Sequence, residues 1–137
     1  MNPAPVRISR DAPAKFTATN GRGASIKVGR SQDGADFSPV ELLMAALGAC
    51  AALSADHVIS RRLGDDAPID VEVTAEKDEE ADRLTSMATR FDLDMSVLGQ
   101  TDQDTLVKLV ARAVERTCTV SHTIEPGVPV ALSVDQV

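Results

Sequence analysis

The stretch Ser38–Cys50, SPVELLMAALGAC, decides the fold of this chain because it joins a helix start to a long apolar run. Ser38 suits the N-cap position, Pro39 suits the first helical position, and Glu41 follows the cap by three residues, as in a capping box. We therefore predict a helix that begins after Ser38 and ends just before Gly64, a residue type that commonly terminates helices.

The apolar run within this helix extends from Leu42 to Leu53 and is 12 residues long when Gly48 is counted. A membrane-spanning helix needs about 20 apolar residues, so the run predicts a buried core helix and no membrane association. The helix is apolar on nearly all sides, and a single sheet covers only one side of a helix. We therefore expect an obligate homodimer in which the central helices of two copies cover each other.

Alternating apolar and polar residues predict strands on both sides of this helix. Residues 14–29 alternate on either side of Asn20-Gly21, a dipeptide that readily accepts positive φ, which indicates a β-hairpin with Arg22 just past its tip. Residues 69–76 and 85–97 alternate as well, and the short charged connector between them favours an antiparallel pair.

The last third of the chain is predicted to hold a second helix. Apolar residues at helical spacing place it at residues 101–117, with a capping box from Thr101 to Asp104. A last short strand is expected at about 128–134. The fold class is therefore α+β, with a mostly antiparallel sheet and two principal helices, in one domain over residues 1–137.

Composition excludes several function classes. The formal net charge of −7 repels nucleic acid and anionic membrane surfaces, and an aromatic content of 2% offers little for base stacking. The first residues contain no apolar segment of signal-peptide length, so we expect a cytoplasmic location. Thiols are kept reduced there, and any disulfide between the two cysteines is expected to be transient.

Cys50 has two interpretations. A cysteine on an apolar helix is often a small buried hydrophobe, because cysteine is among the most frequently buried residue types. A nucleophilic Cys50 needs a positive partner, since burial alone leaves little thiolate to react. Arg22 and Arg30 are the candidates, because the arginines near the helix end lie about three turns further along the axis.

Cys118 directly follows the second helix. A helix C-terminus disfavours a thiolate unless Arg116 or a new turn that begins at Cys118 changes the local field, so Cys50 is the better attacker and Cys118 the better resolver. His57 lies about 10 Å along the helix from Cys50 and is no direct base for its thiol. With His122 these residues lack the close ligand pairs of a zinc site, and we expect neither a metal nor another cofactor.

Three motifs together resemble one known family. SPVELLMAALGAC is preceded by TATNGRG and followed by ERTCTVSHTIE, and in this order and spacing they are similar to the OsmC/Ohr family of osmotically inducible and organic hydroperoxide resistance proteins. The resemblance extends over nearly the whole chain. It implies an intertwined dimer with two central helices between two sheets, and a thiol-dependent peroxidase that reduces organic hydroperoxides to alcohols.

The resemblance also implies roles for four residues. Cys50 matches the peroxidatic cysteine, Cys118 matches the resolving cysteine with which it forms a transient disulfide, and Arg22 matches the arginine that holds the thiolate. Glu41 matches only approximately the glutamate that orients this arginine, because it stands one residue later in the helix and also suits the capping box. Thr119 replaces the proline that usually follows the second cysteine.

The resemblance further suggests a small dithiol such as dihydrolipoamide as the reductant. The peroxidase reaction that the resemblance implies suits these residue types, because a thiolate held by an arginine can attack the distal oxygen of a hydroperoxide. The shifted Glu41 and the unusual Thr119 leave a second interpretation open. In it, the chain is a non-catalytic or redox-sensing module that binds an apolar small molecule in the same dimer pocket.

Overall fold

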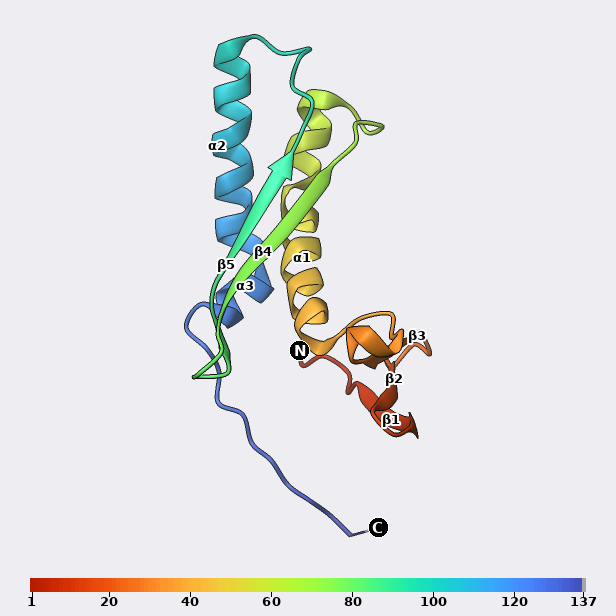
Figure 1. Cartoon of the computed structure of the whole chain (residues 1–137). Coiled ribbons are helices and arrows are strands. Elements are labelled where there is room, and N and C mark those ends of the chain that lie inside the picture. Colours follow the sequence, from red (N-terminus) through yellow and green to blue (C-terminus); the bar gives the residue numbers. More distant parts are fainter. Residues whose placement is uncertain (137) are drawn as a thin grey trace. The chain divides into compact units, whose positions relative to one another are not determined.

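The computed structural model describes residues 1–136 and groups them into two compact units, one ending at Ala45 and the other beginning at Ala46. Helix α1 (Pro39–Leu63) starts in the first unit and continues in the second. The α+β fold class is confirmed. The other elements in Figure 1 are β1 (Arg7–Ala12), β2 (Lys15–Thr19), β3 (Ser25–Gly29), the 3-10 helix η1 (Ser31–Asp33), β4 (Asp70–Asp78), β5 (Arg83–Asp92), α2 (Gln100–Thr117) and α3 (Thr119–Ile124).

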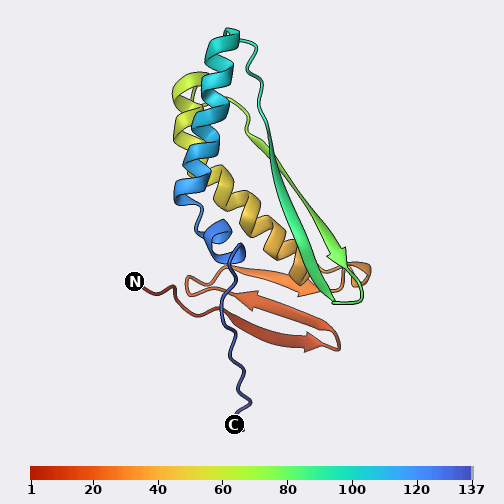
Figure 2. The same ribbon diagram turned by 90° about the vertical axis from the view of Figure 1, so that its left-hand side faces the viewer.

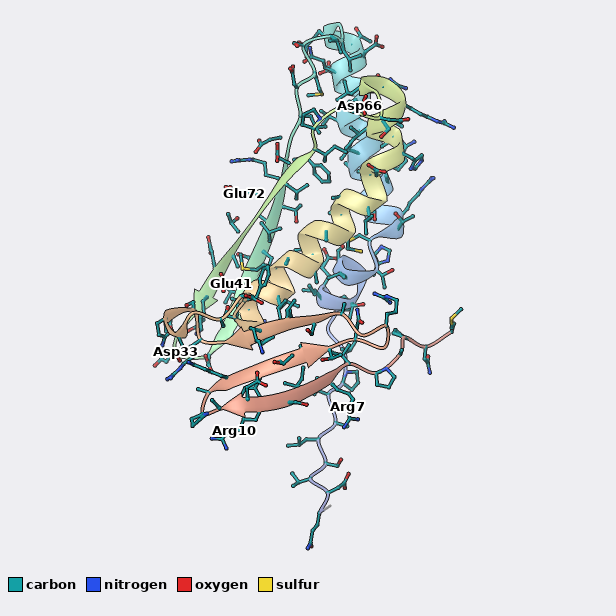
Figure 3. All side chains as sticks on the ribbon, turned by 90° about the vertical axis from the view of Figure 1, so that its right-hand side faces the viewer. Arg7, Arg10, Asp33, Glu41, Asp66 and Glu72 are labelled. Carbon is teal, nitrogen blue, oxygen red and sulfur yellow. The ribbon has the colours of Figure 1, made fainter. Side chains whose placement is uncertain are left out.

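The first unit contains an antiparallel sheet of three strands in the order β1-β2-β3. The predicted hairpin is confirmed as the β2–β3 pair, in which Phe16 lies opposite Val28. Strand β1 was not predicted, because Ile8 is its one large apolar residue. Its charged residues Arg7 and Arg10, labelled in Figure 3, suit an exposed strand at the edge of a sheet.

The turn between β2 and β3 differs in detail from the prediction. Positive φ occurs at Gly23 (90°) and not at Gly21. The side-chain carbonyl of Asn20 accepts hydrogen bonds from the N–H groups of Arg22 (3.0 Å) and Ala24 (3.1 Å). Arg22 therefore lies inside the turn instead of just past it.

Both ends of α1 follow the prediction. The N–H of Ser38 donates to Glu41 Oε1 (2.8 Å) and the N–H of Glu41 donates to the Ser38 hydroxyl (3.2 Å), which completes the capping box. At the other end Gly64 has a φ of 98°, and its N–H donates to the carbonyl of Ser60 (2.8 Å).

In the second unit, β4 and β5 form the predicted antiparallel hairpin. Alternate residues of β4 are half-buried, as the two-residue period of a strand requires, and Glu72 projects from the exposed face away from α1 (Figure 3). The register shifts at Thr85, which is left unpaired as a β-bulge. Strand β5 ends at Asp92, so the predicted strand to residue 97 is too long.

The core of the second unit lies between two helices and the hairpin. Figures 1 and 2 show α1 and α2 side by side in antiparallel directions, with the β4–β5 hairpin along them. Ala55 and Ile59 of α1 pack with Leu106 and Val110 of α2, and these four residues form the buried cluster of the unit. Such close packing of apolar side chains is the main stabilising contribution to a small core.

Gly48 permits a close approach between α1 and β4. A Cβ atom at Gly48 would lie 2.8 Å from Cγ2 of Val73, which is closer than two carbon atoms can approach without a shift. By length and composition alone α1 could cross a membrane, a test that core helices of soluble proteins also pass. Its packing on β4 and α2 fits the predicted core helix.

Helix α2 covers the predicted region but lacks the predicted capping box, so that prediction is wrong. Its N-cap is Gly99, which has no side chain to accept a hydrogen bond, and Thr101 lies inside the helix. Asp104 accepts a hydrogen bond from the side-chain amide of Gln100 (2.9 Å).

The predicted strand at 128–134 is also wrong. After α3 the chain continues to residue 136 without helix or strand. Val130, Leu132 and Val134 are 91%, 90% and 91% exposed. The alternation that favours a strand is therefore present, but no strand within residues 1–136 pairs with it.

Candidate active site

Cys50 lies on α1 in the second unit, at the boundary between the core and the open surface of the helix. Its side chain is half-buried and its thiol is free. Leu47 and Ala51 beside it are 8% and 1% exposed, whereas Leu53 on the open side is 78% exposed. The hydroxyl of Ser54 donates to the Cys50 carbonyl (2.8 Å), so it is engaged with the backbone.

Cys118 joins α2 to α3 and has no exposed surface. Its N–H donates to the carbonyl of Val114 (3.0 Å), and its carbonyl accepts the N–H of His122 (3.0 Å). Both helices therefore hold its backbone. A new helical turn begins at Cys118, which is one of the two predicted conditions, beside Arg116, for a more favourable field at this sulfur.

The two thiols lie next to each other in the second unit. Burial raises the pKa of the Cys118 thiol, and the neighbouring Cys50 raises it further through hydrogen bonding and charge. The N–H and the hydroxyl of Ser121 act on this pKa in the opposite direction. Cys50 is thus the thiol that solvent can reach, and Cys118 is a buried thiol beside it with a raised pKa.

Ser121 is a site residue that the sequence analysis missed. It is the third residue of α3, and Cys118 is the N-cap of that helix. The signal that could have found it is its position three residues after Cys118. This spacing has no meaning without a helix that begins after Cys118, and α3 was not predicted.

Arg22 belongs to the first unit, in the turn between β2 and β3, and it is exposed. Its backbone is fixed by the hydrogen bond to Asn20. Within residues 1–136 its guanidinium forms no hydrogen bond or salt bridge, in contrast to Arg30, which pairs with Asp33 (2.7 Å). Arg22 is therefore the freer of the two arginines that were candidates for a thiolate partner.

Glu41 has the capping role that the sequence analysis gave as its alternative. The N–H of Ser38 lowers the pKa of this carboxyl most, and the Ser38 hydroxyl lowers it further. Figure 3 places Glu41 at the first turn of α1. Its carboxylate is thus engaged with the backbone at the start of its own helix.

Neither histidine is placed as a base for a thiol. His57 is exposed on α1, two turns beyond Cys50. The Nε2–H of His122 donates to the carbonyl of Glu115 (2.6 Å), so this ring binds the end of α2.

The chain has an α+β fold in which the long apolar helix carries a partly exposed free cysteine. A second free cysteine, which is buried, lies beside it. These features define a protein with a pair of neighbouring free thiols. A model of the OsmC-like protein family matches residues 32–133. The chain therefore belongs to the OsmC-like family, as the sequence motifs predicted. An uncharacterized protein of Mycobacterium tuberculosis is 34% identical to it over 127 residues, which are 93% of either chain.

Solved structures agree with this fold. An OsmC-like protein from Mycoplasma pneumoniae has a TM-score of 0.70 at 13% identity, with 90% of this chain and 88% of that chain covered. The organic hydroperoxide resistance protein OhrB of Bacillus subtilis has a TM-score of 0.56 at 20% identity, with 90% and 92% covered. At these identities the similarity establishes the fold alone.

Proposed function

We propose that this chain is a thiol-dependent peroxidase that reduces organic hydroperoxides to alcohols. The observation that carries the proposal is the half-buried Cys50 beside the fully buried Cys118. Two neighbouring thiols of unequal burial support a reaction in two steps, in which an oxidant meets the exposed thiol first and the buried thiol then attacks the oxidised sulfur. Membership of a family with organic hydroperoxide resistance proteins supports the proposal.

The reaction begins at Cys50. Its thiolate attacks the distal oxygen of ROOH, the O–O bond breaks, the sulfur becomes a sulfenic acid, and the alkoxide takes up a proton as alcohol. Cys118 then attacks the Cys50 sulfur, so that the S–S bond forms, the S–O bond breaks, and hydroxide leaves with the Cys118 proton as water. A dithiol such as dihydrolipoamide reduces the disulfide by exchange and is itself oxidised to a cyclic disulfide.

Arg22 supplies the positive charge in this proposal. A guanidinium lowers the pKa of a nearby thiol and stabilises negative charge on the separating oxygens. Its lack of another partner within residues 1–136 supports this assignment. We expect Arg22→Gln to slow oxidation of Cys50 without affecting the later disulfide step, whereas Arg30→Gln should leave both steps unchanged.

The test is consumption of cumene hydroperoxide by the purified protein with dihydrolipoamide as reductant. We expect turnover that is lost in Cys50→Ser, and slower turnover of hydrogen peroxide because the apolar neighbours of Cys50 favour an alkyl substrate. Ser54→Ala is a matched control on the same helix, since its hydroxyl bonds to a backbone carbonyl. Equal rates for the wild type and Cys50→Ser would contradict the proposal.

The second candidate is a redox-sensing or non-catalytic module that binds an apolar small molecule. The observation that favours it is Glu41, whose carboxylate is occupied by Ser38 and does not serve an arginine. This function predicts no hydroperoxide turnover in the wild type. It also predicts that a variant with serine at both Cys50 and Cys118 binds a fluorescent apolar probe, anilinonaphthalene sulfonate, as tightly as the wild type.

We further propose that the functional form is a homodimer. One face of the first unit is an apolar hollow, while Leu53 on α1 and alternate residues of the C-terminal segment are strongly exposed in the second unit. Exposed apolar surfaces of this extent are typical of interfaces, and a second copy would bury them. The hollow is lined chiefly by Val6, Ile8, Phe16, Ile26, Val28 and Leu42.

A further inference from the structure

Asn20 and Gly21 form the one Asn-Gly pair of the chain, and the peroxidase steps above use neither residue. Asn20 is half-buried directly after β2, whereas Gly21 is exposed. Within residues 1–136 the N–H of Gly21 makes no hydrogen bond. The Gly21 nitrogen is therefore free of the backbone pairing that fixes most amides of the hairpin.

The turn holds the Asn20 side chain close to this nitrogen. The side-chain carbonyl of Asn20 accepts the N–H groups of Arg22 (3.0 Å) and Ala24 (3.1 Å). The first of these hydrogen bonds closes a ring of atoms that contains the backbone of Gly21, so the side chain is folded back along that residue. Two N–H donors on one carbonyl oxygen also polarise the carbonyl carbon, as the donors of an oxyanion hole do.

We propose that Asn20 is a site of spontaneous deamidation, and that its product places a carboxylate in the turn that carries Arg22. Asparagine is one of the thermolabile residue types. In the first step the Gly21 nitrogen attacks Cγ of Asn20. The N–Cγ bond forms, the Cγ–Nδ2 bond breaks, and ammonia leaves with the proton of the Gly21 N–H. A following glycine favours this step, because it has no side chain that restricts ring closure.

Water then opens the resulting succinimide ring in one of two ways. Attack at Cγ leaves an aspartate, whose carboxylate still has an oxygen that can accept both N–H groups of the turn. Attack at the main-chain carbonyl leaves an isoaspartate, in which the backbone runs through Cγ and is one carbon longer. This longer backbone lies beside the last pair of the hairpin, Thr19 opposite Ser25, and loosens it. The aspartate product preserves the hairpin.

The aspartate product acts on Arg22. Its carboxylate accepts the backbone N–H of Arg22, so a negative charge lies in the same turn as the guanidinium that the proposed function assigns to the Cys50 thiolate. A carboxylate in this turn competes with the thiolate for the guanidinium. This consequence rests on the proposed function, whereas the deamidation itself does not.

The first test follows the folded protein during incubation at mildly alkaline pH without peroxide. Asn2 is the internal control, because it is the one other asparagine and precedes Pro3, which has no N–H to lose. We expect peptide mass spectrometry to find the mass gain of an amide-to-carboxylate change at Asn20 and not at Asn2. Asn20→Ser keeps a short acceptor for the turn and should show no gain. An Asn20 amide that survives in the folded protein would overturn the proposal, whether or not the protein in urea loses it.

The second test measures the consequence with Asn20→Asp, which represents the product. We expect cumene hydroperoxide to oxidise Cys50 roughly two- to fivefold more slowly than in Asn20→Ser, the effect of one exposed ion pair, and the difference to shrink as salt is added. Equal rates in the two variants would overturn the effect on Arg22 and leave the peroxidase function standing. A wild type whose Cys50 is not oxidised would overturn the peroxidase function, and the mass measurement would still decide the modification.

Discussion

Cys118, with no exposed surface, lies against the half-buried Cys50, so that a thiol between α2 and α3 adjoins a thiol on α1. This difference in burial assigns an order to their oxidation. Cys50 is partly exposed, whereas Cys118 has no exposed surface and its pKa is raised by burial. Under the proposed peroxidase function, Cys118 is therefore expected to react with Cys50 instead of with the bulk oxidant.

Cys118→Ser is expected to permit one turnover and then stall. Cys50 is still oxidised, but the resolving thiol is absent, so sulfenic acid accumulates to one equivalent per protomer. Mass spectrometry after trapping with dimedone would measure it. Sustained turnover of Cys118→Ser with dihydrolipoamide would instead show that the external dithiol attacks Cys50 directly.

Glu41 predicts an acid-dependent contribution to stability. The hydrogen bonds from Ser38 lower the pKa of the Glu41 carboxyl. The ionised carboxylate therefore adds to the free energy of unfolding in full above the ordinary glutamate pKa, and this addition is lost as the pH falls through the lowered pKa. We expect the wild type to have a higher urea midpoint than Glu41→Gln at pH 7, and the difference to shrink as the pH falls below the ordinary glutamate pKa and through the lowered one. Glu115→Gln, on the exposed side of α2, is the control. A pH-independent difference would argue against ionised capping.

Gly48→Ala is expected to destabilise the protein by about 1–3 kcal/mol, although alanine is the better helix former by about 1 kcal/mol. The reason is the 2.8 Å approach between the new Cβ and Cγ2 of Val73. Urea unfolding measures the change. Val73→Ala should cost less in the Gly48→Ala background than in the wild type, because it removes the clash. A Gly48→Ala protein as stable as the wild type would contradict the close packing of α1 on β4.

Thr119→Pro is expected to stabilise the protein by about 0.4–1 kcal/mol. Thr119 is the first residue of α3, a position whose backbone conformation suits proline. Proline also restricts the conformations of the unfolded chain, which favours the folded state. Within residues 1–136 the N–H of Thr119 makes no backbone hydrogen bond that proline would remove. Thr123→Pro, inside α3, should instead destabilise by about 3 kcal/mol. Urea midpoints measure both changes. A loss of stability in Thr119→Pro would show that the turn after Cys118 is incompatible with proline.

Elements with a strong periodic pattern were predicted from the sequence. The two-residue period of β4 and β5 and the capping box of α1 act over a few neighbouring residues, so the sequence alone reveals them. Strand β1 was missed because its place depends on pairing with β2, not on its own residues. Helix α3 was missed because Thr119, Val120 and Thr123 are β-branched, a residue type that disfavours helices when packing does not decide.

The candidate site was also predicted only in part, because some of its features depend on elements that the sequence pattern does not reveal. Cysteine positions follow from motifs, but Ser121 comes close to the Cys118 thiol only because α3 begins directly after Cys118. Residues 128–134 do alternate between apolar and other side chains, yet a strand needs a neighbouring strand, and the described residues of a single chain supply none.

The proposed dimer predicts that an exposed apolar residue of the C-terminal segment matters and that its polar neighbour does not. Leu132 is 90% exposed in the single chain, and Ser133 beside it would point the other way in an extended segment. We expect Leu132→Asp to shift the equilibrium from dimer toward monomer, because burying an unpaired carboxylate in the interface is costly. Ser133→Asp is the control and should leave the dimer intact. Sedimentation experiments measure both. Leu53→Asp tests the exposed side of α1 in the same way. A monomeric wild type would refute the dimer, and equal dimer fractions for Leu132→Asp and Ser133→Asp would remove the C-terminal segment from its interface.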